Sequence, residues 1–252
     1  MSRAALVRLA IIIGVLIAWE ALRRFDLVNA IILASPSEMW RAAEVAGGQF
    51  LEAFQITLAE ILIAIVITWA LGVGIGLVGG ASARVGNAMG PILSSLFAIP
   101  LVVWYPLFMV WVGIGPASKI LFGVVSGFLP IALNTMAGVR LLDRRYITLG
   151  RAMGASPRQI WIKMLVPLAL PSVISGLRIG TALVVIGVVV TEMLASLGGI
   201  GFWISYHRTL FNTGHVYLGM LLALACALLV NWGLTRLEHR FGEWREIERS
   251  QT

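Results

Sequence analysis

The chain has 252 residues, 59% of them hydrophobic and 12% charged, with a formal net charge of +7 and a mean hydropathy of +0.93. This composition excludes a soluble globular domain and predicts an integral membrane protein whose solvent is lipid. The single cysteine, Cys226, excludes an intrachain disulfide and carries no redox inference.

A basic head at residues 1–8 is followed by an apolar run that only Glu20 interrupts. Such a start fits a secretory signal or a retained first helix. No small-x-small cleavage pattern precedes Arg23, so a retained helix over about 6–22 is expected. A short amphipathic helix is predicted over 37–46, capped by Ser35 or Ser37, with a break at the Gly47–Gly48 pair.

Five further apolar stretches each have roughly the 20 residues that a bilayer core requires. They cover about 54–78, 88–112, 117–139, 170–194 and 216–234. The expected fold is therefore an all-α integral membrane protein with six transmembrane helices, forming one transmembrane domain over 1–252 with core helices at about 54–235. Six spans place both termini on the same side of the membrane.

Positive charge is distributed unequally between the two sides of this topology. Only Arg23, Arg24, Arg41, Lys119 and Arg208 fall on one side, and the other Arg and Lys residues of the loops and termini fall on the opposite side. The positive-inside rule places the termini and the loop at about 140–169 in the cytoplasm. Topology therefore explains the net charge, and no nucleic-acid partner is expected. The tail after Arg236, including Glu238, Glu243, Glu246 and Glu248, is predicted to be a solvated end.

The loop from residue 148 to residue 171 is the longest basic, partly polar segment of the chain. Glycine accepts a positive φ, so Gly154 is expected to join two short helical pieces. The stretch 157–165 is predicted to be an amphipathic helix lying across the membrane surface. Pro167 and Pro171 are expected to end one helix or to start the next.

Gly154 is followed at the correct spacing by Met164, Val166 and Pro167. This spacing resembles the second half of the pattern Glu-Ala-Ala-x3-Gly-x9-Ile-x-Leu-Pro, found in the permease subunits of bacterial binding-protein-dependent ABC importers. Residues 148–150 are Thr-Leu-Gly where that family has Glu-Ala-Ala, so the ion pair made by that Glu with an ATPase should be absent. The surrounding sequence resembles the branch that imports sulfonates, taurine, nitrate and related small molecules.

The resemblance implies a type I ABC importer permease fold with a cytoplasmic coupling helix. It also implies a homodimer, two cytoplasmic ATPase subunits and an extracytoplasmic solute-binding protein. The chain contains no P-loop, so it is expected to have no catalytic residues and no cofactor of its own, and ATP and Mg²⁺ would bind to the ATPase. The residues expected to couple to the ATPase are Arg151, Gly154, Ala155, Ser156, Arg158, Ile160, Lys163, Met164 and Pro167.

Ionisable residues within spans should face protein or water, because a charge in lipid costs at least about 2.5 kcal/mol. This applies to Glu60, Arg178 and Glu192. Arg178 and Glu192 are separated by nearly four helical turns and lie on nearly the same face, which should line the pathway or a subunit interface. A structural role for Glu192, pairing with a loop donor, remains an alternative. The pathway candidates are Pro100, Trp104, Tyr105, Asn134, Arg178 and Glu192.

Other patterns have simpler explanations. Gly74, Gly76 and Gly79 match a dinucleotide-binding pattern, but they lie at the end of an apolar helix with no preceding soluble strand. Gly72, Gly76 and Gly80 recur every four residues, which predicts the close approach of another helix. His207, His215 and His239 lack the spacing of metal ligands, so no metal site is expected.

Two alternatives to the importer remain at this point. The first is a self-contained carrier or channel driven by an ion gradient, with Glu60, Arg178 and Glu192 as ion sites. Secondary carriers often show two matching halves, which this sequence does not display. The second is a membrane scaffold that transports nothing, which the polar residues inside the spans disfavour.

Overall fold

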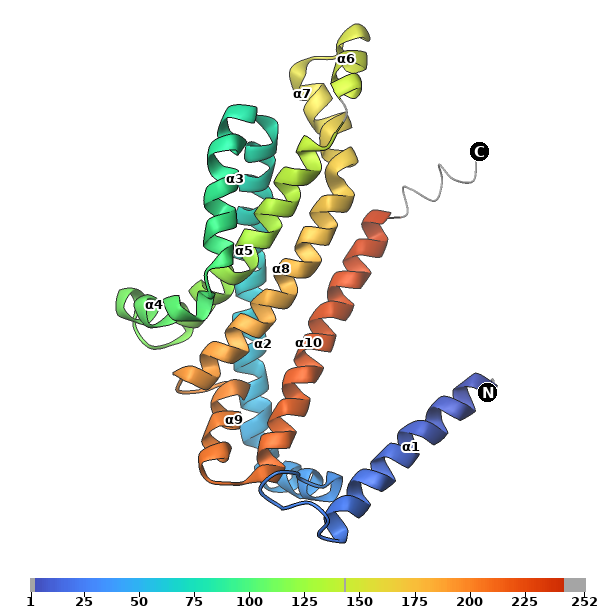
Figure 1. Ribbon diagram of the computed structural model, residues 1–252, viewed down its shortest axis with the longest axis vertical. Helices are drawn as coiled ribbons and strands as arrows, with labels where there is room; N and C mark the ends of the chain where they lie inside the picture. The colour runs from blue at the N-terminus through green and yellow to red at the C-terminus, as the bar shows by residue number, and fades with distance from the viewer. Residues whose placement is uncertain (1–2, 143, 243–252) are drawn as a thin grey trace. The chain divides into compact units, whose positions relative to one another are not determined.

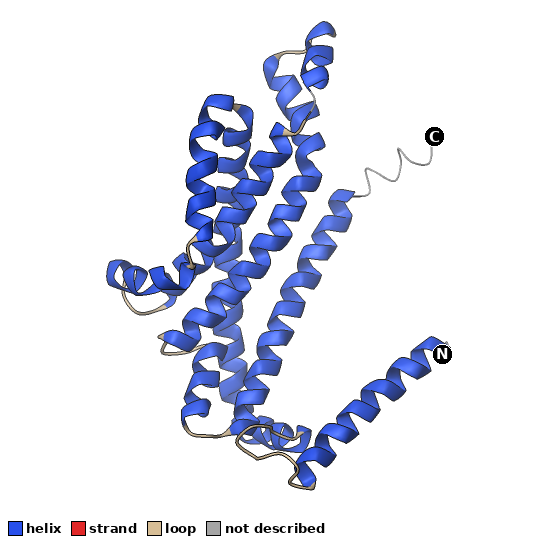
Figure 2. Ribbon diagram, in the orientation of Figure 1, coloured by secondary structure: helices blue, strands red, loops and turns tan. Residues whose placement is uncertain are grey.

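The computed structural model describes residues 3–142 and 144–242, which form helices joined by short loops and contain no strand (Figure 2). Five helices in this part of the chain are long and apolar enough to cross a membrane, or six if one bent pair counts as a span. This result agrees with the predicted six spans when the bent pair is counted as one of them. The chain divides into two compact units, 1–58 with 189–226 and 59–188 with 227–252.

The first unit contains α1 (Arg3–Arg24) and α9 (Ile200–Thr209), together with parts of α2 (Pro36–Ala81), α8 (Val166–Leu194) and α10 (Thr213–Gly242). Polar contacts fasten α1 and α10 to the segment that precedes α2. The indole nitrogen of Trp19 donates to the carbonyl of Ala34 over 2.8 Å, and the hydroxyl of Tyr217 donates to the carbonyl of Ile32 over 3.0 Å.

The start of α2 is closed by a reciprocal cap. The Ser35 hydroxyl accepts from the backbone N–H of Glu38, and a Glu38 carboxylate oxygen accepts from the N–H of Ser35. Ser35 is thus confirmed as the cap. The predicted break at Gly47–Gly48 is wrong, because α2 continues for 46 residues. Glycine costs only about 1 kcal/mol in a helix, and burial of Ala46 and Phe50 on either side of the pair holds this segment helical.

The second unit is built around α5 (Pro116–Arg140; Figure 1). Most residues of this helix are buried. The predicted glycine repeat on α2 packs against this helix. A Cβ added at Gly72, Gly76 or Gly80 would lie 2.7, 2.5 and 2.5 Å from the side chains of Ile131, Thr135 and Val139, respectively. The three glycines therefore allow α2 and α5 to approach more closely than alanine would permit.

The predicted third span is not one straight helix. It consists of α3 (Ala83–Ala98), a 3-10 turn (Leu101–Trp104) and α4 (Tyr105–Val112), and the two parts are bent by 88°. The helix ends before Pro100, because a proline disfavours the helical conformation of the residue that precedes it. The expected span over 88–112 therefore applies only if both arms lie in the membrane.

The segment that follows the Gly154 loop is a continuous helical run. It comprises α7 (Pro157–Ile160), a π-helical turn (Trp161–Leu165) and α8, and together they extend from Pro157 to Leu194. Neither Pro167 nor Pro171 ends a helix here, because Pro167 is the second residue of α8 and Pro171 lies inside it. The π turn just upstream is the kind of local adjustment that lets a membrane helix accommodate proline.

Candidate functional site

The Gly154 loop is a hydrogen-bonded joint between α6 (Arg144–Ala152) and α7. Gly154 has a φ of +75°, and its N–H donates to the carbonyl of Arg151, while the N–H of Ala155 donates to the carbonyl of Gly150, both over 3.0 Å. These two bonds form a Schellman motif. Ser156 then caps α7 in a reciprocal arrangement with Gln159. The predicted junction of two helical pieces at Gly154 is confirmed.

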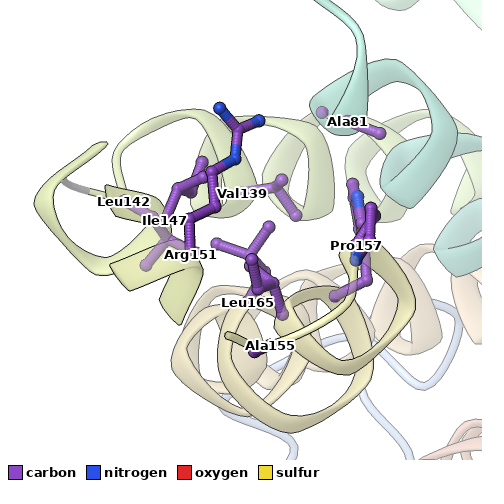
Figure 3. A pocket seen from close by; sticks show the side chains of 11 residues that line it. Ala81, Val139, Leu142, Ile147, Arg151, Ala155, Pro157 and Leu165 are labelled. Atoms are coloured by element: carbon purple, nitrogen blue, oxygen red, sulfur yellow. The ribbon is translucent and has the colours of Figure 1, made fainter. Parts of the chain in front are cut away.

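The inner side of this joint encloses a pocket of about 260 Å³ (Figure 3). Its lining is mainly apolar, and the guanidinium of Arg151 extends away from the aliphatic groups around it. The lining residues are Gly80, Ala81, Val139, Leu142, Ile147, Arg151, Ala155, Pro157, Ile160, Trp161 and Leu165. Of these residues, Ile160 also lies against Gly150 of α6, so closely that a Cβ on the glycine would lie 2.9 Å from the isoleucine side chain.

The predicted coupling residues divide into two groups in the structure. Ile160 is buried, and Ala155 and Met164 are half-buried, so these three hold the joint together. The exposed members are Arg151, Gly154, Ser156, Arg158, Lys163 and Pro167. Leu149 and Met153, which are 55% and 78% exposed on the same segment, were not predicted from the sequence. Their position beside Gly154 was the signal that could have identified them.

Glu192 lies in the first unit and is only 1% exposed. Its carboxylate accepts from the hydroxyl of Thr57 and from the N–H of Gly201, each over 2.8 Å. The Thr57 hydroxyl oxygen in turn accepts from the N–H of Ile200 over 2.8 Å. The carboxylate therefore occupies the start of α9, where unpaired N–H groups and the helix dipole favour a negative charge.

Glu192 therefore has the structural role that the sequence left open, because its carboxylate pairs with hydrogen-bond donors, including one at the start of α9. Gly199, at the turn between α8 and α9, has a φ of +101°, and a Cβ there would overlap the Glu192 carboxylate. Thr57 was not predicted, because nothing in its own neighbourhood along the chain shows that α9 and Glu192 approach it.

Arg178 and Glu192 bind different partners although they share α8. Arg178 lies in the second unit, has a side chain that is 60% exposed, and forms an ion pair with Glu238 of α10. The Glu238 side chain is only 14% exposed, so its prediction as part of a solvated end is wrong. It is held by the opposite charge on α8. Glu243, Glu246 and Glu248, predicted to share that end, lie outside the described residues.

Glu60 and Lys119 form a buried ion pair in the second unit. They are 4% and 2% exposed, and the Lys119 ammonium nitrogen lies 2.5 Å from a Glu60 carboxylate oxygen. The prediction that Glu60 faces protein or water is thus confirmed, because Glu60 faces protein. Lys119, expected among the charges of the outer loops, is instead the fourth residue of α5 and is buried.

The remaining pathway candidates lie near α4 and α5. Tyr105 is buried with its ring edge-on to Phe122, Trp104 is half-buried, and Pro100 is exposed at the bend. Asn134 is half-buried, and its amide nitrogen donates to the carbonyl of Pro130 one turn earlier over 2.8 Å. That bond satisfies one of the two amide hydrogens of Asn134 within its own helix.

Comparison with known proteins assigns the family. Residues 71–243 match the model of the binding-protein-dependent transport system inner membrane component. The chain belongs to this family. It is 28% identical over 251 residues to the taurine transport system permease protein of Escherichia coli, covering 97% of this chain and 91% of the relative. It is 30% identical over 232 residues to the formylaminopyrimidine transport permease protein of Halalkalibacterium halodurans, covering 92% of each.

The fold also matches that of a solved transporter. A structure of the MetNI methionine ABC transporter in an inward-facing conformation matches with a TM-score of 0.68, covering 79% of this chain and 98% of that chain at 22% identity. The all-α type I ABC importer permease fold predicted from the sequence is therefore correct. The chain is the permease component of an ABC importer, as the resemblance at Gly154 implied.

Proposed function

We propose that this chain forms the translocation pathway of an ATP-driven importer whose ATPase is a separate polypeptide that docks on the Gly154 loop. The observation that carries the proposal is the joint of α6 and α7 around Gly154, within the segment that matches the family model. The chain itself has no P-loop. Two copies of the chain, two ATPase subunits and an extracytoplasmic binding protein complete the assembly.

The helical continuity after the loop supports a mechanical role. The docking segment and the membrane-spanning helix are parts of one continuous helical run from Pro157 to Leu194. A displacement of α7 by a closing ATPase would therefore move the span without a flexible linker to absorb it. ATP binding draws the two Gly154 loops of the dimer together and opens the central cavity between the two copies outward. Hydrolysis returns the dimer to its starting conformation.

The orientation follows from the charges of the sequence. We place the Gly154 loop and both termini in the cytoplasm of a bacterial inner membrane, because positive charge accumulates on the sides of membrane proteins that remain in the cytoplasm. The exposed Arg151, Arg158 and Lys163 of the loop agree with this placement.

The substrate class is a small anion such as a sulfonate, nitrate or small organic acid. Similarity to permeases named for taurine, nitrate and bicarbonate supports this assignment. Arg178 adds no support, because Glu238 already neutralises it. The relative named for formylaminopyrimidine makes a neutral heterocycle the alternative class, and the extracytoplasmic binding protein would make the choice.

The proposal is tested by purifying the tagged chain in mild detergent from its native membrane and identifying co-purifying proteins by mass spectrometry. A P-loop ATPase in equal amount, lost when residues 148–167 are replaced by a Gly-Ser linker, is expected. Recovery of the chain alone, with solute movement in vesicles that lack ATP, would instead favour a carrier driven by an ion gradient.

A further inference from the structure

The pocket beside the Gly154 joint reaches from the surface of the second unit to buried side chains (Figure 3). Ala81, Arg151 and Pro157 line it and are exposed, whereas Ile160 and Leu165, also in its lining, are only 4% and 5% exposed. Its volume of about 260 Å³ exceeds that of an apolar cavity of about 150 Å³, which stays free of water and binds benzene. The buried part of the pocket therefore suits a hydrocarbon group better than water.

Arg151 gives the exposed part of the pocket a positive charge. Among the lining residues that the structure describes, it is the only one with an ionisable side chain, and its guanidinium extends away from the aliphatic groups (Figure 3). Within residues 3–142 and 144–242, no carboxylate forms an ion pair with Arg151. An apolar interior with a cation at its edge is the complement of an amphiphile that has a negatively charged head.

On the topology proposed above, this pocket lies where the spanning helices reach the cytoplasmic surface of the membrane. Its walls come from the ends of α2 and α5, from α6, and from the helical run that continues into α8. Trp161 of that run is half-buried in the lining, and indole rings favour the boundary between hydrocarbon and headgroups. Acidic phospholipids carry acyl chains and a phosphate on one molecule, and basic pockets between spanning helices on the cytoplasmic side bind such lipids.

We propose that this pocket binds an acidic phospholipid, with part of one acyl chain against Ile160 and Leu165 and the headgroup phosphate near Arg151. A lipid in this position contacts α2, α5, α6 and α7 at once, so it ties the Gly154 joint to the spanning helices. The inference rests on the proposed function only for the cytoplasmic placement of the loop. The ATPase, the binding protein and the transported solute play no part in it.

The test measures lipid binding by native mass spectrometry to the tagged chain, purified in detergent without its ATPase. The probes are phosphatidylglycerol and phosphatidylcholine with the same acyl chains, and wild type should bind phosphatidylglycerol more tightly. Arg151→Gln should weaken binding of phosphatidylglycerol by about fivefold, the contribution of one basic residue near an acidic membrane surface, and should leave phosphatidylcholine unaffected. Arg84→Gln, the same change at an exposed position of α3 outside the pocket lining, is the matched control and should bind within about twofold of wild type.

A second variant tests the place of the acyl chain. Ala81→Phe should weaken binding of both phospholipids, because its phenyl group fills space in the pocket that the chain needs. Thermal unfolding in detergent shows whether this variant is folded, and if it is not, the two arginine variants still decide.

Three results would overturn the inference. The first is equal binding of the two phospholipids by wild type, and the second is an equal loss in Arg151→Gln and Arg84→Gln, which would show a diffuse attraction to basic surface. The third is a folded Ala81→Phe variant that binds both lipids as wild type does. None of these results bears on the proposed function, because recovery of an ATPase with the chain is measured separately.

Discussion

The buried ion pair between Glu60 of α2 and Lys119 of α5 should tolerate joint replacement but not the loss of one partner. Lys119 lies in the first turn of α5, where the helix dipole disfavours a cation, and both residues are almost completely buried. Lys119→Met therefore leaves a carboxylate without its counter-charge in the interior. Glu60→Leu leaves an ammonium group near the positive end of a helix.

The expected magnitude follows from this burial. Removing one partner of a buried ion pair typically costs about 3–5 kcal/mol, whereas replacing both by apolar residues of similar volume is often neutral or stabilising. For a chain of this size, the single variants should lose roughly 6–20 °C in thermal unfolding midpoint. The double variant Glu60→Leu/Lys119→Met should recover most of that loss.

The assay is the thermal unfolding midpoint of each variant in one detergent, followed by tryptophan fluorescence, with membrane abundance as a second readout. A coupling energy of about 3 kcal/mol or more between the two positions is expected. A double variant whose midpoint falls by the sum of the two single losses would show that the charges do not stabilise each other, and the reasoning would fail.

Three further predictions concern particular backbone and side-chain positions. Gly154→Val should abolish transport while the dimer still assembles, because a β-branched residue at a φ of +75° costs at least about 1–2 kcal/mol. Gly154→Asn should retain transport, and normal uptake by the valine variant would show that the joint does not have the proposed role. Glu192→Gln should destabilise the protein by about 1–3 kcal/mol, because its amide group faces the donors of Thr57 and Gly201; unchanged stability with lost uptake would point to substrate contact instead. Burial, and to a lesser extent the neighbouring His215, lowers the pKa of His207, so the stabilising contribution of His207 is complete above about pH 6.5 and declines as pH falls. The unfolding midpoint should therefore drop less between pH 7.5 and 5 in His207→Phe than in wild type. An equal drop in the two proteins would contradict this.

Features that depend on residue spacing along one helix were predictable from the sequence. The positions of the spans follow from apolar length, and the close approach of another helix to α2 follows from the spacing of Gly72, Gly76 and Gly80, although the spacing does not identify that helix as α5. The turn at Gly154 follows from the conformational freedom of glycine between two polar helical pieces. Each of these signals lies within one short stretch of sequence.

The partners of the buried charges were not predictable in the same way. Glu60 and Glu192 clearly need donors, but the sequence does not show that Lys119 and Thr57 supply them, because that depends on how distant helices meet. The continuity of α2 through Gly47–Gly48 was missed for a related reason. Tertiary burial of the flanking residues outweighed the weak local preference of glycine.

Reconstitution into liposomes tests the central claim most directly. Vesicles would contain either the chain alone or the chain with its co-purified ATPase and the extracytoplasmic binding protein, and uptake of taurine, nitrate and formylaminopyrimidine would be measured with ATP or with an imposed proton gradient. The account predicts that at least one solute enters only when the ATPase and ATP are both present. Uptake into vesicles that contain the chain alone, driven by the gradient without ATP, would contradict it.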